Sequence, residues 1–325
     1  DLKSALKIIG EHRDIIKVVT NPVKIHAKKD RQAEVTYKTA RMMDEILPDM
    51  LKQISTSEMT DEQVKEFVKE DWVHWFDPVS NLGELEPYLT GLLRSAKLGA
   101  NVGLASMPMA GSNAPITPEG LLTLAHAEIL FQIALAQTAN PGIVCIHGGF
   151  PCATELTGPR TFSMRHGSPE HNLINLALSR LNMWVTGLPT NQSAASNYQS
   201  RTDEKAYELG REGRELLRRA GFHIIRHAFG FGDNLSYLNF EKLERELEQE
   251  RIDREQERDI HVPVMPITLP EDPQAVEVIT RVGSGMYMED NHTTANLTAF
   301  KDWGKQLEEK EIDAGISLIR ALSYE

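Results

Sequence analysis

Two potential cations, Arg226 and His227, end an apolar run that begins at Phe222. Neighbouring side chains on a strand point to opposite faces, so only one of the two is expected to face a pocket at the strand end. A cation there would bind an anionic group such as a carboxylate, and the other residue would be structural. His147 ends another apolar run, before two glycines. It either faces the same pocket or is a buried, hydrogen-bonded histidine.

Aromatic residues gather at or just past the ends of several apolar runs. They are Trp72, Trp75, Phe76, Phe150, Tyr198, Phe229 and Phe231. Aromatic faces attract quaternary ammonium groups through cation–π interactions. Any single one of these residues is expected to pack in the core, but their joint placement indicates a cage for such a cation.

The segment from His166 to His171 offers residue types that bind metals, with Glu170 between the two histidines. Pro169 begins a helix there, which places His166 in a loop and His171 inside the first helical turn. We therefore expect capping and loop hydrogen bonds in this segment, and no metal. A metal-dependent barrel lyase or hydrolase that uses His147, His166 and Glu170 is an alternative.

Several function classes are disfavoured by what the sequence lacks. It contains no Walker loop, no GxGxxG and no GxSxG, which argues against nucleotide enzymes and common hydrolases. The formal net charge of −12 argues against nucleic-acid binding. Cys145 and Cys152 form no CxxC pair, and their small number indicates a reducing compartment. With no membrane span and no signal peptide expected, we predict a cytoplasmic protein.

Short apolar runs alternate with amphipathic stretches along the chain. Strands are predicted at 15–20, 72–76, 102–106, 143–147, 183–187 and 222–227, with 262–267 a weaker candidate because of its two prolines. Helices are predicted at 84–98, 117–139, 168–181, 203–220 and 238–258. The charge run 241–258 is expected to be a solvated helix face.

This alternation predicts parallel strands joined by crossover helices. Long, chemically rich loops follow many successive strands, which favours a βα barrel of the eight-stranded TIM type over an open doubly wound sheet. We expect the α/β barrel over residues 1–268, with missing strands before Asp1. A helical C-terminal segment over 269–325 is expected to pack on it.

Six segments in the same order carry a family resemblance. The first, SMPMAGSNAPIT at 106–117, resembles the SMPMAGATAPVT segment of the trimethylamine methyltransferase superfamily. GSPEH at 167–171, GLP at 187–189 followed by TDEK at 202–205, AGFHIIRHA at 220–228, VITRVG at 278–283 and EDNHT at 289–293 are similar to further family segments. Arg226 stands at the position of a family histidine. Colinearity over roughly residues 80–300 is more specific than any one segment.

The resemblance implies a βα barrel, a cytoplasmic enzyme and a corrinoid protein as partner. Family members demethylate trimethylamine with pyrrolysine or, without it, quaternary amines such as glycine betaine. No pyrrolysine is present after Gly187, where residues 190–198 stand at the family position. We therefore expect methyl transfer from a glycine betaine-like amine to Co(I) of a corrinoid. The N-terminal part of the family is absent or shortened, and residues 21–70 match weakly.

Candidate site residues follow from strand-end placement and this resemblance. Those expected to bind substrate are Arg226, His227, His147, Glu170, Tyr198, Phe229, Phe150 and Trp75, and those expected to face the corrinoid are Met107, Met109, Gly111 and Asn191. No acid or base is assigned, because a quaternary amine leaves as a neutral tertiary amine.

The corrinoid (cobalamin) is expected on a separate protein, with no tightly bound cofactor on this chain. Asp259-Ile-His261 begins like the DxHxxG corrinoid motif, but Val264 replaces the glycine. A homo-oligomer is also expected. A non-catalytic protein that binds a quaternary amine is the second alternative.

Overall fold

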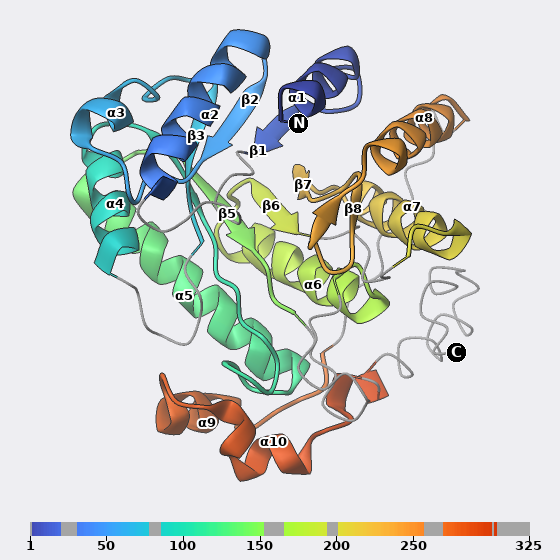
Figure 1. Ribbon diagram of the computed structural model, residues 1–325. Coiled ribbons are helices and arrows are strands. Elements are labelled where there is room, and N and C mark those ends of the chain that lie inside the picture. Colours follow the sequence, from blue (N-terminus) through green and yellow to red (C-terminus); the bar gives the residue numbers. More distant parts are fainter. Residues whose placement is uncertain are drawn as a thin grey trace. The chain divides into compact units, whose positions relative to one another are not determined.

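The computed structural model describes residues 2–20, 31–77, 86–152, 166–193, 201–256, 269–300 and 302–303. Seven parallel strands follow chain order in one sheet (Figure 1). They are β1 (Val18–Thr20), β2 (Leu51–Ile54), β3 (Trp72–Phe76), β4 (Asn101–Leu104), β5 (Cys145–Gly149), β6 (Thr190–Ser193) and β7 (Ile224–Arg226). A helix lies between each pair of consecutive strands, as in a βα barrel. The predicted fold class is confirmed, with seven sheet strands among the described residues.

The crossover helices are α2 (Gln32–Ile46), α3 (Asp61–Lys65), α4 (Glu86–Lys97), α5 (Pro118–Ala139), α6 (Pro169–Val185) and α7 (Glu204–Arg219). The remaining elements are α1 (Leu2–Glu11), the hairpin β8 (Phe231–Gly232) and β9 (Tyr237–Leu238), α8 (Phe240–Gln256), α9 (Ala275–Val282), the short η3 (Tyr287–Glu289) and α10 (Asn291–Ala295). The chain forms two compact units. The first holds 1–78, 84–105 and 129–147, and the second 79–83, 106–128 and 148–325.

One predicted strand is absent, and two observed strands, β2 and β6, were not predicted. Residues 183–187 are not a strand, because α6 continues to Val185 and leaves Trp184 84% exposed. The strand that follows is β6, whose Thr-Asn-Gln-Ser sequence carries no apolar run to mark it. β2 was not predicted, because it buries Lys52 and Gln53. The Lys52 ammonium donates to the Asp71 carboxylate at 2.6 Å and to the Met50 carbonyl at 2.8 Å, which compensates its burial.

A buried polar chain links β3 to α4 in the first unit. His74 Nε2 lies 2.9 Å from the Phe67 carbonyl and must donate to it, so Nδ1 accepts from Ser95 Oγ at 2.9 Å. The Ser95 hydroxyl in turn lies 3.1 Å from that of Thr56. Burial lowers the pKa of His74 to about 4, because the charged imidazolium would lose its hydration. His74 is therefore a neutral structural residue.

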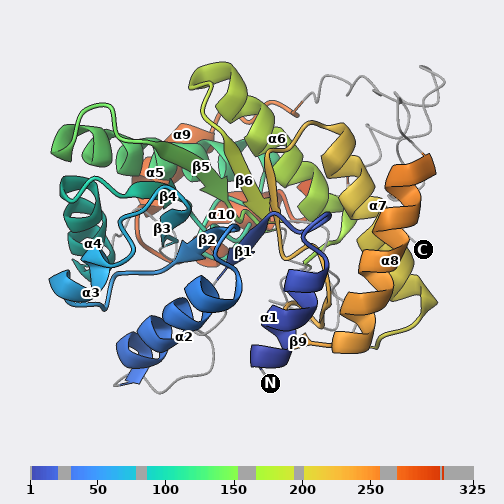
Figure 2. The same cartoon turned by 90° about the horizontal axis from the view of Figure 1, so that it is seen from above.

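In the second unit α7 contacts both α6 and α8 (Figure 2). The predicted solvated face of α8 is present, with exposed Glu241, Glu244 and Glu248. The charge run also has a buried side, because Lys242, Glu246 and Glu250 are buried. Glu246 accepts from Arg214 Nη1 at 3.2 Å and from the Gly230 N–H at 2.7 Å, and it is also paired with Lys242. Each buried charge therefore has an opposite partner.

The segment around α9 and α10 is bonded to the start of α5 within the second unit. His292 Nε2 lies 3.1 Å from the Asp272 carboxylate, which also accepts from the Thr117 hydroxyl. The Tyr287 N–H donates to the Ser112 carbonyl at 3.0 Å. α5 itself is apolar and long enough to cross a bilayer, and 56% of its most apolar window is buried within the fold. A core helix has the same composition.

We predict that Gly103→Ala lowers the free energy of unfolding by about 2–4 kcal/mol, because buried overpacking forces side chains and backbone to shift. A Cβ at Gly103 would lie 1.9 Å from Trp75 Cε3, and the ring is itself buried. Gly10→Ala in α1 is the matched control: its Cβ would lie 3.3 Å from Leu47 Cδ2, so a shift of a few tenths of an ångström suffices, and alanine favours the helix. The stability of this variant should fall much less. Urea unfolding of both variants measures this, and equal stabilities would contradict the packing described.

A second prediction concerns pH and His74. Its folded pKa of about 4 lies below the ordinary 6.5, so the stability it contributes is present above pH 6.5 and is lost as pH falls toward 4. At pH 5.5 this loss is about 1.4 kcal/mol. His74→Gln preserves one donor and one acceptor but does not titrate. Between pH 7.5 and 5.5 the variant should lose about 1 kcal/mol less unfolding free energy than the wild type, and equal losses would refute this role.

Candidate active site

Aromatic and imidazole rings meet beside Phe150, the residue that follows β5. Its ring centroid lies 4.2 Å from that of His166, 5.8 Å from His171 and 5.6 Å from His227. Phe231 lies 5.6 Å from His227 on the other side. We call these five residues the ring cluster. All belong to the second unit and come from the chain after β5, the start of α6, and the region from the end of β7 to β8.

The segment after β5 is held in place by backbone hydrogen bonds to the segment after β4. The Phe150 N–H donates to the Ser106 carbonyl at 2.9 Å, and the Cys152 N–H donates to the Pro108 carbonyl at 2.9 Å. The Ala110 N–H donates back to the Cys152 carbonyl at 3.0 Å. This parallel pairing fixes the direction in which Phe150 and Cys152 project.

The start of α6 positions the two nearby histidines. Ser168 caps the helix by accepting the His171 N–H at 3.2 Å, and Pro169 occupies its first position. The Gly167 N–H donates to His171 Nδ1 at 3.2 Å. As the sequence predicts, His166 precedes the helix and His171 lies in its first turn, yet their ring centroids are only 4.7 Å apart.

The end of β7 brings both of its candidate cations to Phe150. The Arg226 guanidinium lies 5.9 Å from the Phe150 ring centroid, and its Nη2 donates to the Gly149 carbonyl at 3.3 Å. Both side chains approach Phe150, although strand alternation predicts that they point to opposite faces. β7 ends at Arg226, and His227 has a left-handed backbone with φ 57°, which releases its side chain from strand alternation. His227 Nδ1 lies 2.7 Å from Ser193 Oγ.

Loss of hydration keeps the three imidazoles uncharged: His166 and His171 are fully buried, and His227 is partly buried. This loss lowers the pKa of His171 and of His227 to about 3, and it lowers the pKa of His166 well below its usual range. For His166, repulsion from His171, His227 and the Arg226 guanidinium adds to the effect. At neutral pH these rings therefore present uncharged faces and edges beside the Arg226 cation.

The other expected substrate-binding residues lie in varied places. Trp75 belongs to the first unit, where it packs with Val73, Ala105 and Ile146, and its neighbour Phe76 is also buried there. Phe229 lies against Arg214, with the guanidinium 4.8 Å from its ring centroid. His147 is buried in β5, in register with Leu104. Glu170 is buried in the first turn of α6, and Tyr198 lies outside the described residues.

The residues expected to face a corrinoid follow β4 or lie on β6. Met107 and Met109 are partly buried, and Gly111 turns the chain with φ 73°. Asn191 is buried, and neither polar atom of its amide has a hydrogen-bond partner within the part of the chain that the structure describes. The weaker strand 262–267 and the DxHxxG-like segment at 259–264 lie outside that part.

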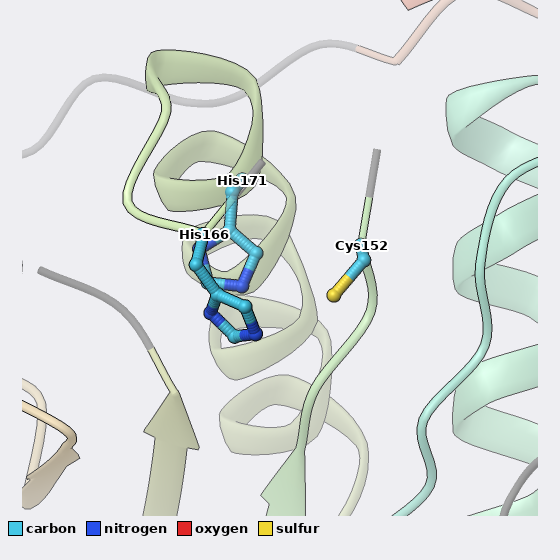
Figure 3. Close-up of side chains that lie close together, drawn as sticks. All are labelled: Cys152, His166 and His171. Atoms are coloured by element: carbon cyan, nitrogen blue, oxygen red, sulfur yellow. The ribbon is translucent and has the colours of Figure 1, made fainter. Parts of the chain in front are cut away.

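The sequence reasoning did not select Cys152. Its thiol lies with the imidazoles of His166 and His171, and one possible ligand atom from each residue lies within 4.8 Å of the others (Figure 3). A metal trio of His147, His166 and Glu170 was considered instead, but the metal-compatible group found among the described residues is this one. A signal was present, because Cys152 follows Phe150 by two residues and so shares its face of an extended segment.

Comparisons with known proteins identify the family of this chain. The family model described as trimethylamine methyltransferase (MTTB) matches residues 22–310. A glycine betaine methyltransferase from Desulfitobacterium hafniense strain Y51 is 30% identical over 243 residues, which cover 70% of this chain and 48% of the relative. A trimethylamine methyltransferase from Methanosarcina mazei is 28% identical over 194 residues, 60% of this chain and 37% of the relative. The chain thus spans half or less of these relatives. It belongs to the trimethylamine methyltransferase (MTTB) family.

Proposed function

We propose that this chain moves a methyl group from a methylated amine to Co(I) of a corrinoid carried by a partner protein, in the reducing cytoplasm. A quaternary or tertiary amine is the substrate class, and a glycine betaine-like zwitterion is favoured. The observation that carries the proposal is the ring cluster beside Arg226 in a member of this family. The aromatic faces would contact the ammonium group of such a ligand, and the guanidinium would contact its carboxylate.

The ring cluster suits the ammonium end of such a substrate. Phe150, His227 and Phe231 lie edge to face, with centroid separations of 5.6 Å for both pairs. Aromatic faces stabilise a methylated ammonium by cation–π attraction, most strongly when water is excluded. Because burial holds the pKa of His227 at about 3, its ring carries no charge that would repel the cation.

Arg226 suits the carboxylate end. The side chain is buried, and one of its nitrogens donates to the Gly149 carbonyl at 3.3 Å. A guanidinium presents its N–H donors in a planar fork, a geometry that matches the two oxygens of a carboxylate. A zwitterion would bring its carboxylate to the buried Arg226 cation while the ligand stays neutral overall.

The chain's own task in the reaction would be positioning and desolvation. A bound corrinoid would supply a Co(I) nucleophile to take the methyl group, while the C–N electron pair stays on nitrogen. A quaternary amine would leave as a neutral tertiary amine, so no residue would have to donate a proton to it. Asn191, with its unpartnered buried amide, and Met107, Met109 and Gly111 are the residues proposed to face the corrinoid. The buried unpartnered amide fits a polar group supplied from outside the chain.

Phe150→Leu tests the cage. Loss of one aromatic face should weaken glycine betaine binding about 3- to 30-fold, and methyl transfer to reduced cobalamin should fall with it. Phe229→Leu is the matched control, since Phe229 lies against Arg214. Isothermal titration and growth of methylcobalamin absorbance measure the two quantities. Equal binding by both variants would refute the cage, and binding without methyl transfer in the wild type would identify a binding protein only.

Arg226→Gln separates the two ends of the substrate. It should weaken glycine betaine binding about 10-fold or more, because a charge-assisted hydrogen bond is lost. Binding of tetramethylammonium, which has no carboxylate, should not weaken. Titration of both ligands into both proteins gives the comparison. If the two affinities fall together, Arg226 supports the fold and does not bind the carboxylate.

A further inference from the structure

We infer that Cys152, His166 and His171 form a site for a divalent transition metal, with zinc the best-fitting ion. The three side chains are buried, and one donor atom from each lies within 4.8 Å of the others. Figure 3 shows the Cys152 sulfur pointing toward the two imidazoles, which come from the turn before α6 and from its first turn. The site stands independently of the proposed methyl transfer.

Ring nitrogens without partners among the described residues support a ligand at this place. Among the described residues, neither ring nitrogen of His166 has a hydrogen-bond partner, and His171 Nε2 has none either. Both side chains are completely buried. Buried polar groups in folded proteins are nearly always paired, because an unpaired one loses its hydration without compensation. A single ion would bind one nitrogen of each histidine together with the thiol.

The Cys152 thiol makes a metal ion a better-fitting ligand for this site than a water molecule or a carboxylate. A thiolate sulfur is a soft ligand that selects zinc and similar ions, and imidazole nitrogens are the second preferred type. A protonated thiol is only a weak hydrogen-bond donor, so it adds little selectivity for a water molecule or a carboxylate. Three protein ligands leave a fourth position open for water or another oxygen ligand.

Separate hydrogen bonds anchor the backbone of each ligand. Cys152 is bonded to Pro108 and Ala110, and His171 is capped by Ser168. The His166 N–H donates to Asn234 Oδ1 at 3.0 Å. In addition, Asn175 Nδ2 bridges the carbonyls of Pro151 and His171, at 3.2 and 2.8 Å, and so ties the thiol segment to the helix. These hydrogen bonds preorganise the three ligand residues for metal binding.

Metal binding requires a defined set of local changes. Zinc bonds of 2.0–2.3 Å place ligand atoms about 3.5 Å apart, so the side chains must close by about 1 Å. The Cys152 thiol, which now lies 3.3 Å from the Phe150 carbonyl, gives its proton to solvent as the zinc–sulfur bond forms. His171 binds through Nε2, so its proton moves to Nδ1 and the 3.2 Å bond from Gly167 is lost. Losing one such bond lowers affinity about fivefold, which a zinc site tolerates.

The test uses the purified chain and added zinc or cobalt(II). Elemental analysis after gel filtration should find about one zinc per chain, and cobalt(II) should give a thiolate charge-transfer band with tetrahedral visible bands. Cys152→Ala should abolish the charge-transfer band and lower cobalt affinity roughly 100-fold or more. Cys145→Ala is the matched control, because Cys145 is the other buried cysteine and lies in β5. It should leave both quantities unchanged.

Three results would overturn the site: no zinc retained and no cobalt band, a band that persists in Cys152→Ala, or equal loss in Cys145→Ala. If Cys152→Ala does not fold, the Cys145→Ala protein still decides, because Cys152 is then its one cysteine. Zinc should slow alkylation of that thiol at least about 10-fold, and an unchanged rate contradicts the proposal. Glycine betaine binding by metal-free protein tests the proposed function separately.

Discussion

The short parallel pairing between residues 106–110 and 150–152 is the constraint on which the site depends. Its backbone hydrogen bonds fix Phe150 and Cys152 on one extended segment, two residues apart, and therefore on one face. The rings of α6 and β7 then gather against that face. Since backbone bonds carry the pairing, the side chains remain available for ligand contacts. A loop without this support would leave Phe150 with many orientations, and ordering it on binding would reduce affinity.

Burial of the imidazoles is the second condition. Three histidines and an arginine meet around one phenylalanine, which would be strongly repulsive if the histidines were charged. The low pKa values mean that the rings are neutral, which removes that repulsion. In each neutral ring one nitrogen carries a proton and the other carries a lone pair. The same property serves both proposals. A neutral ring tolerates a cationic amine, and a neutral ring nitrogen can bind a metal. The two roles fall on different members of the ring cluster, His227 for the amine and His166 with His171 for the ion.

Local signals predicted most of the described fold, because they act within a few residues. The apolar run of β3, and the Thr-Pro and Ser-Pro starts of α5 and α6, were each placed correctly. β2 and β6 were missed because buried polar side chains remove the expected pattern. The pairing of His166 with His171 and Cys152 could not be read from spacing, since it depends on a tertiary contact. The sequence predicted where α6 begins, but not which side chains His166 and His171 would contact there. Trp75 was grouped with Phe150 by strand-end position alone, and it packs within the first unit.

The left-handed backbone of His227 places two separate demands on one position. With φ 57°, the chain there favours glycine or asparagine, and a β-branched residue would be strained. The contacts with Phe150, Phe231 and Ser193 ask instead for an aromatic ring with a polar edge. Histidine is among the few residues that tolerate this backbone and also satisfy those contacts. Selection for stability alone would therefore drift toward glycine or asparagine here, and a histidine retained in evolving lineages would report selection on what the ring binds.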